Sequence, residues 1–185
     1  MAIQLRPVYQ IKVTLKNIRP PIWRRLLIPA TMSLIELHRV LQLSMGWFDA
    51  HLHQFIVGRE YFGDLEFDDF DTMQDETKYT ISDLLQYEKD SLIYEYDFGD
   101  GWEHEVVLEK ILSYKKGMLL PVCIKGKRSC PPEDVGGAWG YQEFIETISD
   151  PDDPEYEDVL EWVGGEFDPE YYDEAAINQM LHDHF

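Results

Sequence analysis

Three histidines stand at positions from which their imidazoles could meet around a metal ion. His51 and His53 are two residues apart in the run HLHQFIV, and His104 lies in DGWEHEV. Alternate residues of a β-strand project from the same face, so His51 and His53 would point together if this run is a strand. Imidazole nitrogen is a common zinc ligand. If the strand that carries His104 is a neighbour, Asp97, Asp100 or a cysteine could complete the set.

A structural role for the same histidines is the competing interpretation. His53 and His104 would then be partly buried, hydrogen-bonded residues of a sheet, and His51 would face solvent. The linear order does not bring the three side chains together, so we favour this interpretation. We accordingly expect no resident cofactor, and a divalent metal at the histidines is the alternative.

The run CIKGKRSCPPEDVGG, residues 123–137, combines two thiols, three cations, an acidic pair and paired prolines and glycines. Its C-x6-C spacing differs from the C-x2-C of zinc ribbons and redox pairs. The prolines stiffen the chain, the glycines permit a tight turn, and a helix start follows, which Glu133 or Asp134 can cap. We therefore interpret the run as a self-capped rigid connector built by Cys123, Cys130, Pro131, Pro132, Glu133, Asp134, Gly136 and Gly137.

Cationic side chains support a rival interpretation of this region, an anion or partner site. Lys125, Lys127 and Arg128 precede the helix start, and cations so close would lower the pKa of a neighbouring thiol. Arg24 and Arg25, which follow a tryptophan, could form a similar surface, because guanidinium stacks on indole and forks onto carboxylate or phosphate. We favour the alternative in which these arginines pair with acids of the same chain.

Charge is unevenly spread along the 185 residues, whose formal net charge is −20. Residues 1–60 carry eight Lys/Arg against three Asp/Glu, whereas residues 129–185 carry seventeen acids and no Lys or Arg. Nucleic acids and anionic membranes are normally bound through basic patches, so this charge disfavours direct nucleic-acid binding and a membrane partner. We expect the basic part to pack beside the acidic part and to be partly neutralised there.

The composition indicates one soluble, cytoplasmic domain that spans residues 1–185. With 44% apolar residues, a chain of this length can bury one substantial core. No stretch approaches the roughly 18 apolar residues of a membrane span, and the start MAIQLRPVYQ lacks a signal-peptide pattern. Two cysteines are too few for a disulfide scaffold.

Residues 1–62 form a basic part for which hydrophobic periodicity predicts the order strand, strand, helix, strand. Patterning predicts the strands YQIKVTLK, IWRRLLI and HLHQFIV. Before the third strand, Ser33 and Glu36 form a capping box for a helix that ends at Gly46. This order resembles the start of a β-grasp arrangement.

Residues 63–128 form a hairpin part. Its first stretch, residues 63–78, is acidic and aperiodic, which indicates an exposed loop. A short helix follows, and then SLIYEYD and WEHEVVLEKIL are predicted as strands joined by a turn at Asp100 and Gly101. The run LLPVCI is a candidate last strand.

Residues 129–185 form an acidic helical part. Helices are predicted in AWGYQEFIETI, PEYEDVLEWV and DEAAINQMLHDHF, the second capped by Asp153 and the third by Asp173. The predicted fold class is therefore α+β, with a mixed, mainly antiparallel sheet and the C-terminal helical segment packed on it.

Five longer segments resemble one known family. They are YQIKVTLKNIRPPIWRR, LHRVLQLSMGWFDAHLHQF, YDFGDGWEHEVVLEKI, CPPEDVGGAWGY and DPEYEDVLEWVGGEFDPEYYD. On these motifs, which cover nearly the whole chain, the protein is identified as a member of the plasmid pRiA4b ORF-3-like family, also known as insertion-element passenger proteins of TnpR type. The resemblance implies one α+β domain in a plasmid or mobile-element context, and it implies no catalytic residue that can be carried over.

The sequence gives a recombinase activity little chemical support. A serine recombinase needs a serine among arginines and a basic DNA-reading domain, and here residues 129–185 have no cations. We therefore favour a non-catalytic interaction or accessory protein whose aromatic and acidic surfaces bind a protein partner. A metal-dependent hydrolase built on His51, His53 and His104 is the first alternative. A nucleic-acid-binding accessory protein that uses the basic part is the second.

Overall fold

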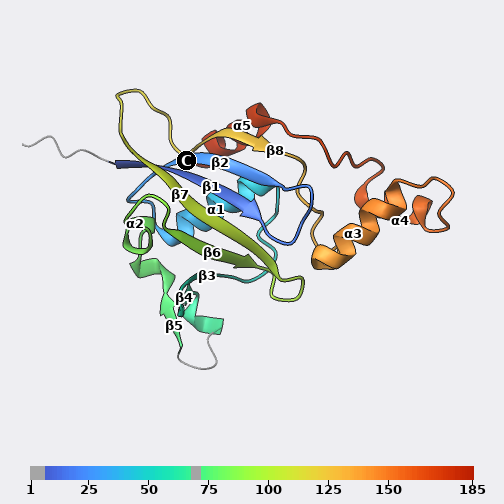
Figure 1. The fold of residues 1–185 in the computed structure, drawn as a ribbon, viewed down its shortest axis with the longest axis horizontal. Coiled ribbons are helices and arrows are strands. Elements are labelled where there is room, and N and C mark those ends of the chain that lie inside the picture. The colour runs from blue at the N-terminus through green and yellow to red at the C-terminus, as the bar shows by residue number, and fades with distance from the viewer. Residues whose placement is uncertain (1–6, 68–71) are drawn as a thin grey trace, which may run out of the picture.

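The computed structural model describes residues 7–67 and 72–185 (Figure 1). In these residues eight strands join in one sheet. They are β1 (Pro7–Leu15), β2 (Trp23–Pro29), β3 (His53–Val57), β4 (Glu60–Gly63), β5 (Met73–Asp75), β6 (Ser91–Tyr96), β7 (Trp102–Ser113) and β8 (Val122–Lys127). The helices of the same residues are α1 (Leu34–Met45), α2 (Ile81–Leu84), α3 (Gly137–Ile148), α4 (Tyr156–Val163) and α5 (Glu174–His184), with 3₁₀ turns η1 (Leu65–Phe67) and η2 (Glu76–Lys78).

The strands lie in the order β5-β4-β3-β6-β7-β1-β2-β8. Neighbours are antiparallel except β4 and β5, which are parallel. The predicted α+β class with a mixed, mainly antiparallel sheet is thus confirmed. Strands of residues 1–62 and 63–128 interleave, because β6 and β7 lie between β3 and β1. The strand-strand-helix-strand order is present, and the likeness to a β-grasp arrangement stays a prediction.

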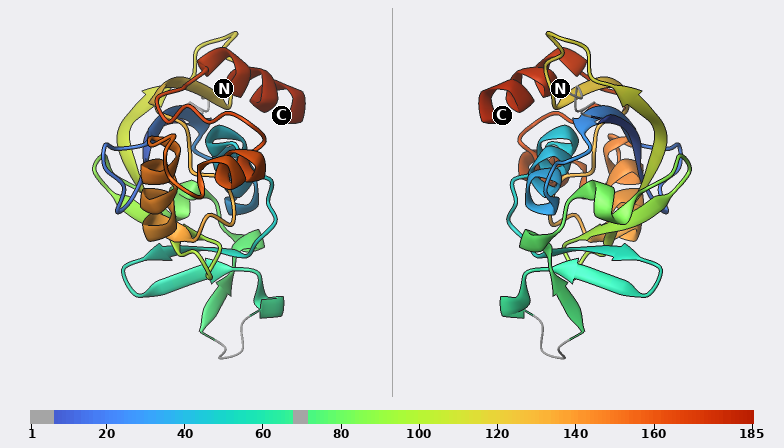
Figure 2. Two further views of the ribbon diagram at one scale, coloured as in Figure 1. Left: turned by 90° about the vertical axis from the view of Figure 1, so that its right-hand side faces the viewer. Right: turned by 90° about the vertical axis from the view of Figure 1, so that its left-hand side faces the viewer.

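Helix α1 lies across one face of the sheet and supplies much of the core (Figures 1 and 2). The predicted capping box is confirmed, since the Ser33 hydroxyl accepts from the Glu36 N–H and the Glu36 carboxylate accepts from the Ser33 N–H. The helix ends at Gly46, whose φ of +89° is a conformation that glycine adopts without strain. Its leucine stripe is buried against the sheet as its 3.6-residue periodicity predicts.

The β6–β7 hairpin also follows its sequence pattern. Trp102, His104, Val106 and Leu108 share the buried face of β7, as strict alternation requires. The turn falls at Asp100 and Gly101, as predicted. This hairpin matters for the candidate site because its turn carries two of the acidic side chains discussed below.

Two sequence-based expectations need correction. Residues 63–78 are not a plain loop, because η1, β5 and η2 form within the described part, while residues 68–71 lie outside it. The strand β5 forms because its backbone groups pair with β4, and the side-chain pattern of the segment does not indicate this pairing. Helix α4 begins at Tyr156 and not at Pro154, since Asp153 accepts from the N–H of Glu155 and makes a turn before the helix.

The C-terminal helices pack in two places. Helix α5 contacts β8 and α1, and Asn178 bonds both backbone groups of Cys123. Helices α3 and α4 contact each other and lie beyond one end of the sheet, at the right of Figure 1. None of the helices in the described residues has the length and apolar character that crossing a membrane requires.

Several cations are neutralised within the chain, although mainly by β7 and not by the C-terminal part. Lys16 pairs with Glu103 at 2.5 Å, and Arg25 pairs with Glu109 through Nε and Nη2 at 2.6 and 2.8 Å. Arg128 is the exception, because it reaches Glu170 of the C-terminal part at 2.6 Å. The strand order explains why the partners differ. The strands β1 and β2 come directly after β7 in the order of the sheet, whereas Arg128 follows β8 at the edge of the sheet.

Candidate metal centre

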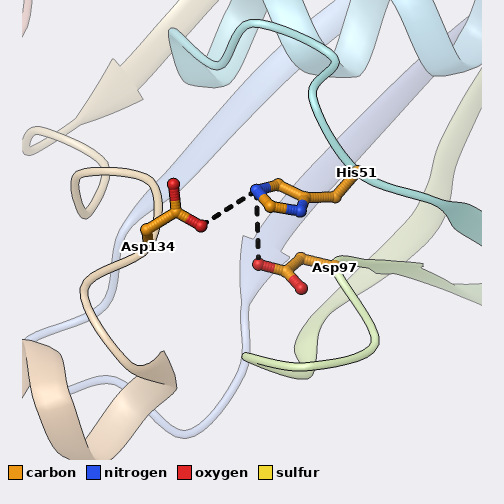
Figure 3. Close-up of side chains that lie close together, drawn as sticks. All are labelled: His51, Asp97 and Asp134. Carbon is orange, nitrogen blue, oxygen red and sulfur yellow. Dashed lines mark ion pairs between the residues drawn. The ribbon is translucent and has the colours of Figure 1, made fainter.

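Three segments that are far apart in sequence meet near one end of the sheet. His51 lies in the loop between α1 and β3, Asp97 follows β6, and Asp134 lies in the loop before α3 (Figure 3). His51 Nε2 is 3.1 Å from Asp134 Oδ1 and 3.7 Å from Asp97 Oδ2. One ligand atom from each of these residues lies within 4.8 Å of the other two.

These separations fit a shared metal ion. Bonds of about 2.1 Å place neighbouring ligand atoms about 3.0 Å apart in an octahedron and about 3.4 Å apart in a tetrahedron. The two His51 distances, 3.1 and 3.7 Å, lie at or close to these values. An imidazole with two carboxylates is a ligand set that suits zinc, manganese or iron. Three protein ligands also leave at least one position for water or substrate.

His51 is the member of the centre whose ring nitrogen Nε2 has no hydrogen-bond partner. Its Nε2 is buried and makes no hydrogen bond to any described group, although the two carboxylates lie close by. Buried polar atoms are rarely left unpaired, since each such atom costs about 1–3 kcal/mol. The ring packs edge-on against Tyr96, with 5.8 Å between centroids. A metal ion between His51 and the carboxylates would satisfy this nitrogen.

Both acidic residues of the centre have left-handed backbone conformations. Asp97 has φ +56° and Asp134 has φ +60°. Such conformations cost a non-glycine residue about 1 kcal/mol, although aspartate tolerates them better than most. Strain of this kind is concentrated at functional sites, where the surrounding structure holds it in place.

Hydrogen bonds accepted by Asp97 shape the turn after β6, and one accepted by Asp100 ties this turn to the loop of Asp134. Asp97 Oδ1 accepts from the N–H groups of Gly99 and Asp100, at 3.0 and 3.3 Å. Asp100 Oδ2 accepts from Gly136 N at 3.1 Å. Gly137 packs so closely that a Cβ there would lie 2.4 Å from the Asp100 carbonyl oxygen. Asp100 therefore positions the loop of Asp134 and is not itself in the cluster.

A second set of bonds ties the His51 loop to the loop before α3. Trp47 Nε1 donates to the Pro131 carbonyl at 2.9 Å. The Tyr96 hydroxyl donates to Glu133 at 2.5 Å and accepts from Ala50 N at 2.9 Å. Burial, followed by the bond to Glu133, raises the pKa of Tyr96, so the hydroxyl stays protonated as a donor. All three segments of the centre are therefore cross-linked around Tyr96.

His53 does not join His51, although the two were expected to share a face of one strand. His51 precedes β3, and His53 begins it. His53 Nε2 lies 2.9 Å from Glu76, and its ring stacks on His38 with centroids 3.6 Å apart. His38 in turn bonds Asp49 at 2.7 Å and the Tyr94 hydroxyl at 2.8 Å. Burial, then the neighbouring His53, lowers the pKa of His38 to about 4.

His104 is also separate from the centre. The side chain is fully buried, its Nδ1 lies 3.2 Å from the Tyr94 carbonyl, and its Nε2 makes no hydrogen bond within the described chain. Burial lowers its pKa to about 4, so the ring is neutral. Trp47 packs edge-on against it, with 5.1 Å between centroids. The three predicted histidines therefore do not converge, and only His51 meets Asp97.

The connector run 123–137 has a different cap from the predicted one. Helix α3 begins after Gly136 without a side-chain cap from its own segment. Glu133 instead bonds Tyr96, Asp134 faces His51, and the acid that accepts from Gly136 is Asp100. The left-handed turn at Asp134 accounts for this outcome, because the chain reverses between the acids and the helix start. Pro131 is buried and Pro132 is half-buried.

The two thiols are not activated by their cationic neighbours. Burial raises the pKa of Cys130 to about 11 and also raises that of Cys123. Arg24 opposes the shift in both cases, yet desolvation is the larger effect. The expectation of a lowered thiol pKa is therefore wrong. Both cysteines are free.

The predicted anion-binding residues are spread over two faces. Arg24 is 3% exposed and donates to the carbonyls of Ser44, Trp23, Lys127 and Arg128. Arg25 and Arg128 form the ion pairs given above, while Lys125 and Lys127 are exposed on β8. Arg24 therefore holds backbone segments together, since carbonyls occupy most of its donors.

Sequence reasoning missed Asp134 as a partner of His51. Its position between a proline pair and a glycine pair was explained by turn geometry alone. It also missed the group around His53, in which His38 and Glu76 are buried and Asp49 is exposed. A capped amphipathic helix gives no sign that a histidine on its buried face has polar partners, so only the tertiary structure places these residues together.

Comparison with known proteins places the chain in a family. The family model described as "Plasmid pRiA4b ORF-3-like protein" matches residues 7–176. The chain belongs to the plasmid pRiA4b ORF-3-like family. One relative is the uncharacterized protein y4hQ of Sinorhizobium fredii, which is 39% identical over 172 residues, covering 92% of this chain and 86% of y4hQ.

A solved structure of the same kind comes from Methanosarcina mazei Go1. This protein of unknown function, MM3350, is 39% identical, with a TM-score of 0.84, covering 92% of this chain and 97% of MM3350. The match confirms the α+β fold. Three of the segments that carry the likeness to the plasmid pRiA4b ORF-3-like family, namely LHRVLQLSMGWFDAHLHQF, YDFGDGWEHEVVLEKI and CPPEDVGGAWGY, are those that contribute His51, Asp97 and Asp134.

Proposed function

We propose that this protein binds a divalent metal ion at His51, Asp97 and Asp134 and uses it in a hydrolytic reaction. The observation that carries the proposal is the convergence of these three side chains, with ligand atoms within 4.8 Å of one another. Two carboxylates this close repel each other, and a cation between them relieves that repulsion. The Nε2 of His51, which lies near both carboxylates but makes no hydrogen bond to a described group, adds a third reason for a metal.

The chemistry of such a centre follows from its open positions. A metal ion lowers the pKa of bound water and so generates hydroxide at neutral pH. A cavity of about 170 Å³ is lined by one member of the centre, His51, and by His53, Glu76 and Phe98 among others. In this cavity His53, held by Glu76, is the group best placed to accept a proton. The cavity is large enough for a small substituent of a substrate.

Metal content is the decisive measurement. Protein purified without chelator or a metal-affinity tag should contain close to one equivalent of zinc, manganese or iron by elemental analysis. His51→Ala and Asp134→Asn should each lower the affinity for added Mn²⁺ or Zn²⁺ by about 100-fold, because each removes one of three ligands. His104→Gln is the matched control, since it changes a histidine outside the centre.

The hydrolytic part needs its own readout. Metal-loaded protein should cleave at least one of a set of chromogenic phosphodiester, carboxylester and anilide substrates, and His53→Ala should keep the metal while losing the activity. Wild-type protein that is folded, free of metal and unable to take up Mn²⁺ or Zn²⁺ would refute the metal site. Metal binding without turnover of any substrate class would leave a binding role and refute hydrolysis.

A second candidate function is a non-catalytic interaction or accessory protein. It is favoured by the exposed aromatic side chains in the segments of the centre, since Phe48 is 85% and Trp139 is 81% exposed. Large exposed aromatic residues mark protein-binding surfaces. Under this function, replacing Phe48 and Trp139 by serine should abolish binding of the partner without changing the metal content.

Direct nucleic-acid binding has the weakest support of the three candidates. Lys16, Arg25 and Arg128 are engaged in ion pairs, and Arg24 is buried. The remaining charge is strongly negative, so phosphate would be repelled. A mobility-shift assay at several salt concentrations tests this candidate, which requires binding that weakens steeply with salt.

A further inference from the structure

A second surface feature lies on the far side of Asp134, between α3 and α4. A groove of about 260 Å³ runs there, with a floor of apolar side chains that includes Phe144, Val159 and Trp162. Phe144 is buried and contacts Trp162 edge-on, with centroids 6.1 Å apart. Trp162 itself is 52% exposed, so one part of its ring faces solvent.

Helix α4 has an apolar side that is only partly covered. Patterning of its eight residues is amphipathic, yet none of them is fully buried. Amphipathic helices normally bury such a stripe against a partner. Together with α3, α4 lies beyond the end of the sheet (Figure 1). The groove between the two helices is a surface pocket of the described chain.

The rim of the groove is acidic. Asp134, Glu143 and Glu155 line it, and neither glutamate side chain makes an ion pair or hydrogen bond with any described group. Residues 129–185 contain no Lys or Arg, so no cation of these helices can neutralise the rim. An apolar floor with an uncompensated acidic rim is complementary to a cationic and partly apolar segment.

We propose that the α3–α4 groove binds an arginine-containing segment of a protein partner. Guanidinium would stack on the exposed face of Trp162 and pair with Glu143 and Glu155, while an aliphatic side chain of the same segment covers Val159. Nucleic acid is repelled by the same charges. Asp134 is the one acidic residue that the groove shares with the metal centre. Glu143 and Glu155 belong to the groove alone, so binding through them does not need the metal.

A labelled peptide tests this directly. The probe is a fluorescein-labelled peptide of three Leu-Arg-Ala-Arg repeats, titrated with metal-free protein by fluorescence anisotropy at 0.15 M salt. The reference probe has glutamine in place of every arginine. Wild-type protein should bind the arginine peptide and not the glutamine peptide.

Matched variants separate the groove from general charge attraction. Glu143→Gln with Glu155→Gln should weaken binding at least about tenfold, and Trp162→Ala about fivefold, as for central contact residues. Glu157→Gln with Glu161→Gln removes the same charge from exposed positions of α4 outside the groove. This control should change the affinity less than about twofold. Circular dichroism confirms that each variant is folded.

Three results would overturn the proposal. One is no binding of the arginine peptide by wild-type protein. Another is equal weakening by the two double variants, which would mean that the net charge alone attracts the peptide. The third is a concentration-dependent dimer in light scattering that the Glu143 and Glu155 changes dissociate, since a second copy of this chain would then be the occupant.

Discussion

Two histidine groups lie close together in this molecule and differ in how completely their polar atoms are paired. In the first group the rings of His53 and His38 stack. His53 is hydrogen-bonded to Glu76, and His38 to Asp49 and Tyr94. Around His51, two carboxylates approach without a hydrogen bond to a buried nitrogen. The same HLH run thus supplies one residue to a closed network and one to an open centre. The buried Nε2 of His104 also lacks a hydrogen bond, so it is the two nearby carboxylates together with incomplete pairing that single out His51.

The first prediction tests the open centre. Asp97→Asn keeps an acceptor for the Gly99 N–H but removes the charge, so the affinity for Mn²⁺ or Zn²⁺ should fall by about 100-fold. The free energy of unfolding should change by no more than about 1 kcal/mol, because asparagine also tolerates a left-handed backbone. Calorimetric titration and urea unfolding measure the two quantities. If Asp97→Asn lost much stability but kept its metal affinity, Asp97 would be a structural residue and not a metal ligand.

The second prediction concerns acid, which should affect two buried histidines: His38 of the closed group around His53, and His104, which lies outside both groups. The folded pKa of His38 and of His104 is about 4, below the ordinary 6.5. The folded protein therefore binds fewer protons than the unfolded chain between about pH 4 and pH 6.5. Stability should be complete above pH 6.5 and fall as the pH drops toward 4, by up to about 3 kcal/mol for each histidine.

Urea unfolding at several pH values measures this dependence. His104→Gln removes one of the two titrating groups, so its unfolding free energy should depend less steeply on pH over the same interval than that of the wild type. An identical slope in wild type and variant would show that His104 is not neutral and buried in the folded state.

The third prediction removes a member of the closed network. His53→Ala leaves the Glu76 carboxylate without its partner and His38 without its stacked ring. We expect a loss of about 2 kcal/mol in the free energy of unfolding, with metal affinity unchanged within about twofold. Thermal unfolding and metal titration of the same sample provide both readings. If His53→Ala also lost its affinity for metal, the groups around His51 and His53 would have to be regarded as one site.

The fourth prediction sharpens the comparison at the loop contact. Asp100→Ala removes the acceptor for Gly136 N and should weaken metal binding about tenfold, since the loop of Asp134 loses its tether. Asp150→Ala is a suitable control, because Asp150 makes a similar bond to a backbone N–H in a turn away from the centre. Equal metal affinities for the two variants would show that Asp100 does not position the centre.

Local patterns were sufficient to predict most elements of the fold. Ser33, Glu36 and Gly46 mark both ends of α1, and Asp100-Gly101 marks the hairpin, because caps and turns depend on neighbouring residues. The strand β5 was missed because a three-residue strand exists only through its pairing with β4.

The candidate site could be predicted only in part. His51 and Asp97 were recognised as ligand types, but the second acidic partner of His51, Asp134, belongs to a loop that had a sufficient local explanation. His53 was grouped with His51 because alternation predicts a shared face, and His104 on the condition that its strand is a neighbour. In the structure β3 begins at His53 and leaves His51 in the preceding loop. Long-range contacts decide which polar groups stay unpaired, and periodicity carries no information about them.

The bond between Asp100 and Gly136 has a consequence for the order in which the protein is assembled. A nascent chain can complete the strands β1 to β7 before the loop of Asp134 leaves the ribosome. His51 and Asp97 would then be in place before Asp134 joins them. A bound ion then stabilises only the fully docked state, by an amount that grows with the logarithm of its concentration. Under the proposed function, metal supply would control how firmly the loop of Asp134 stays docked, whereas β8 and α5 are held by their own contacts with β2 and α1.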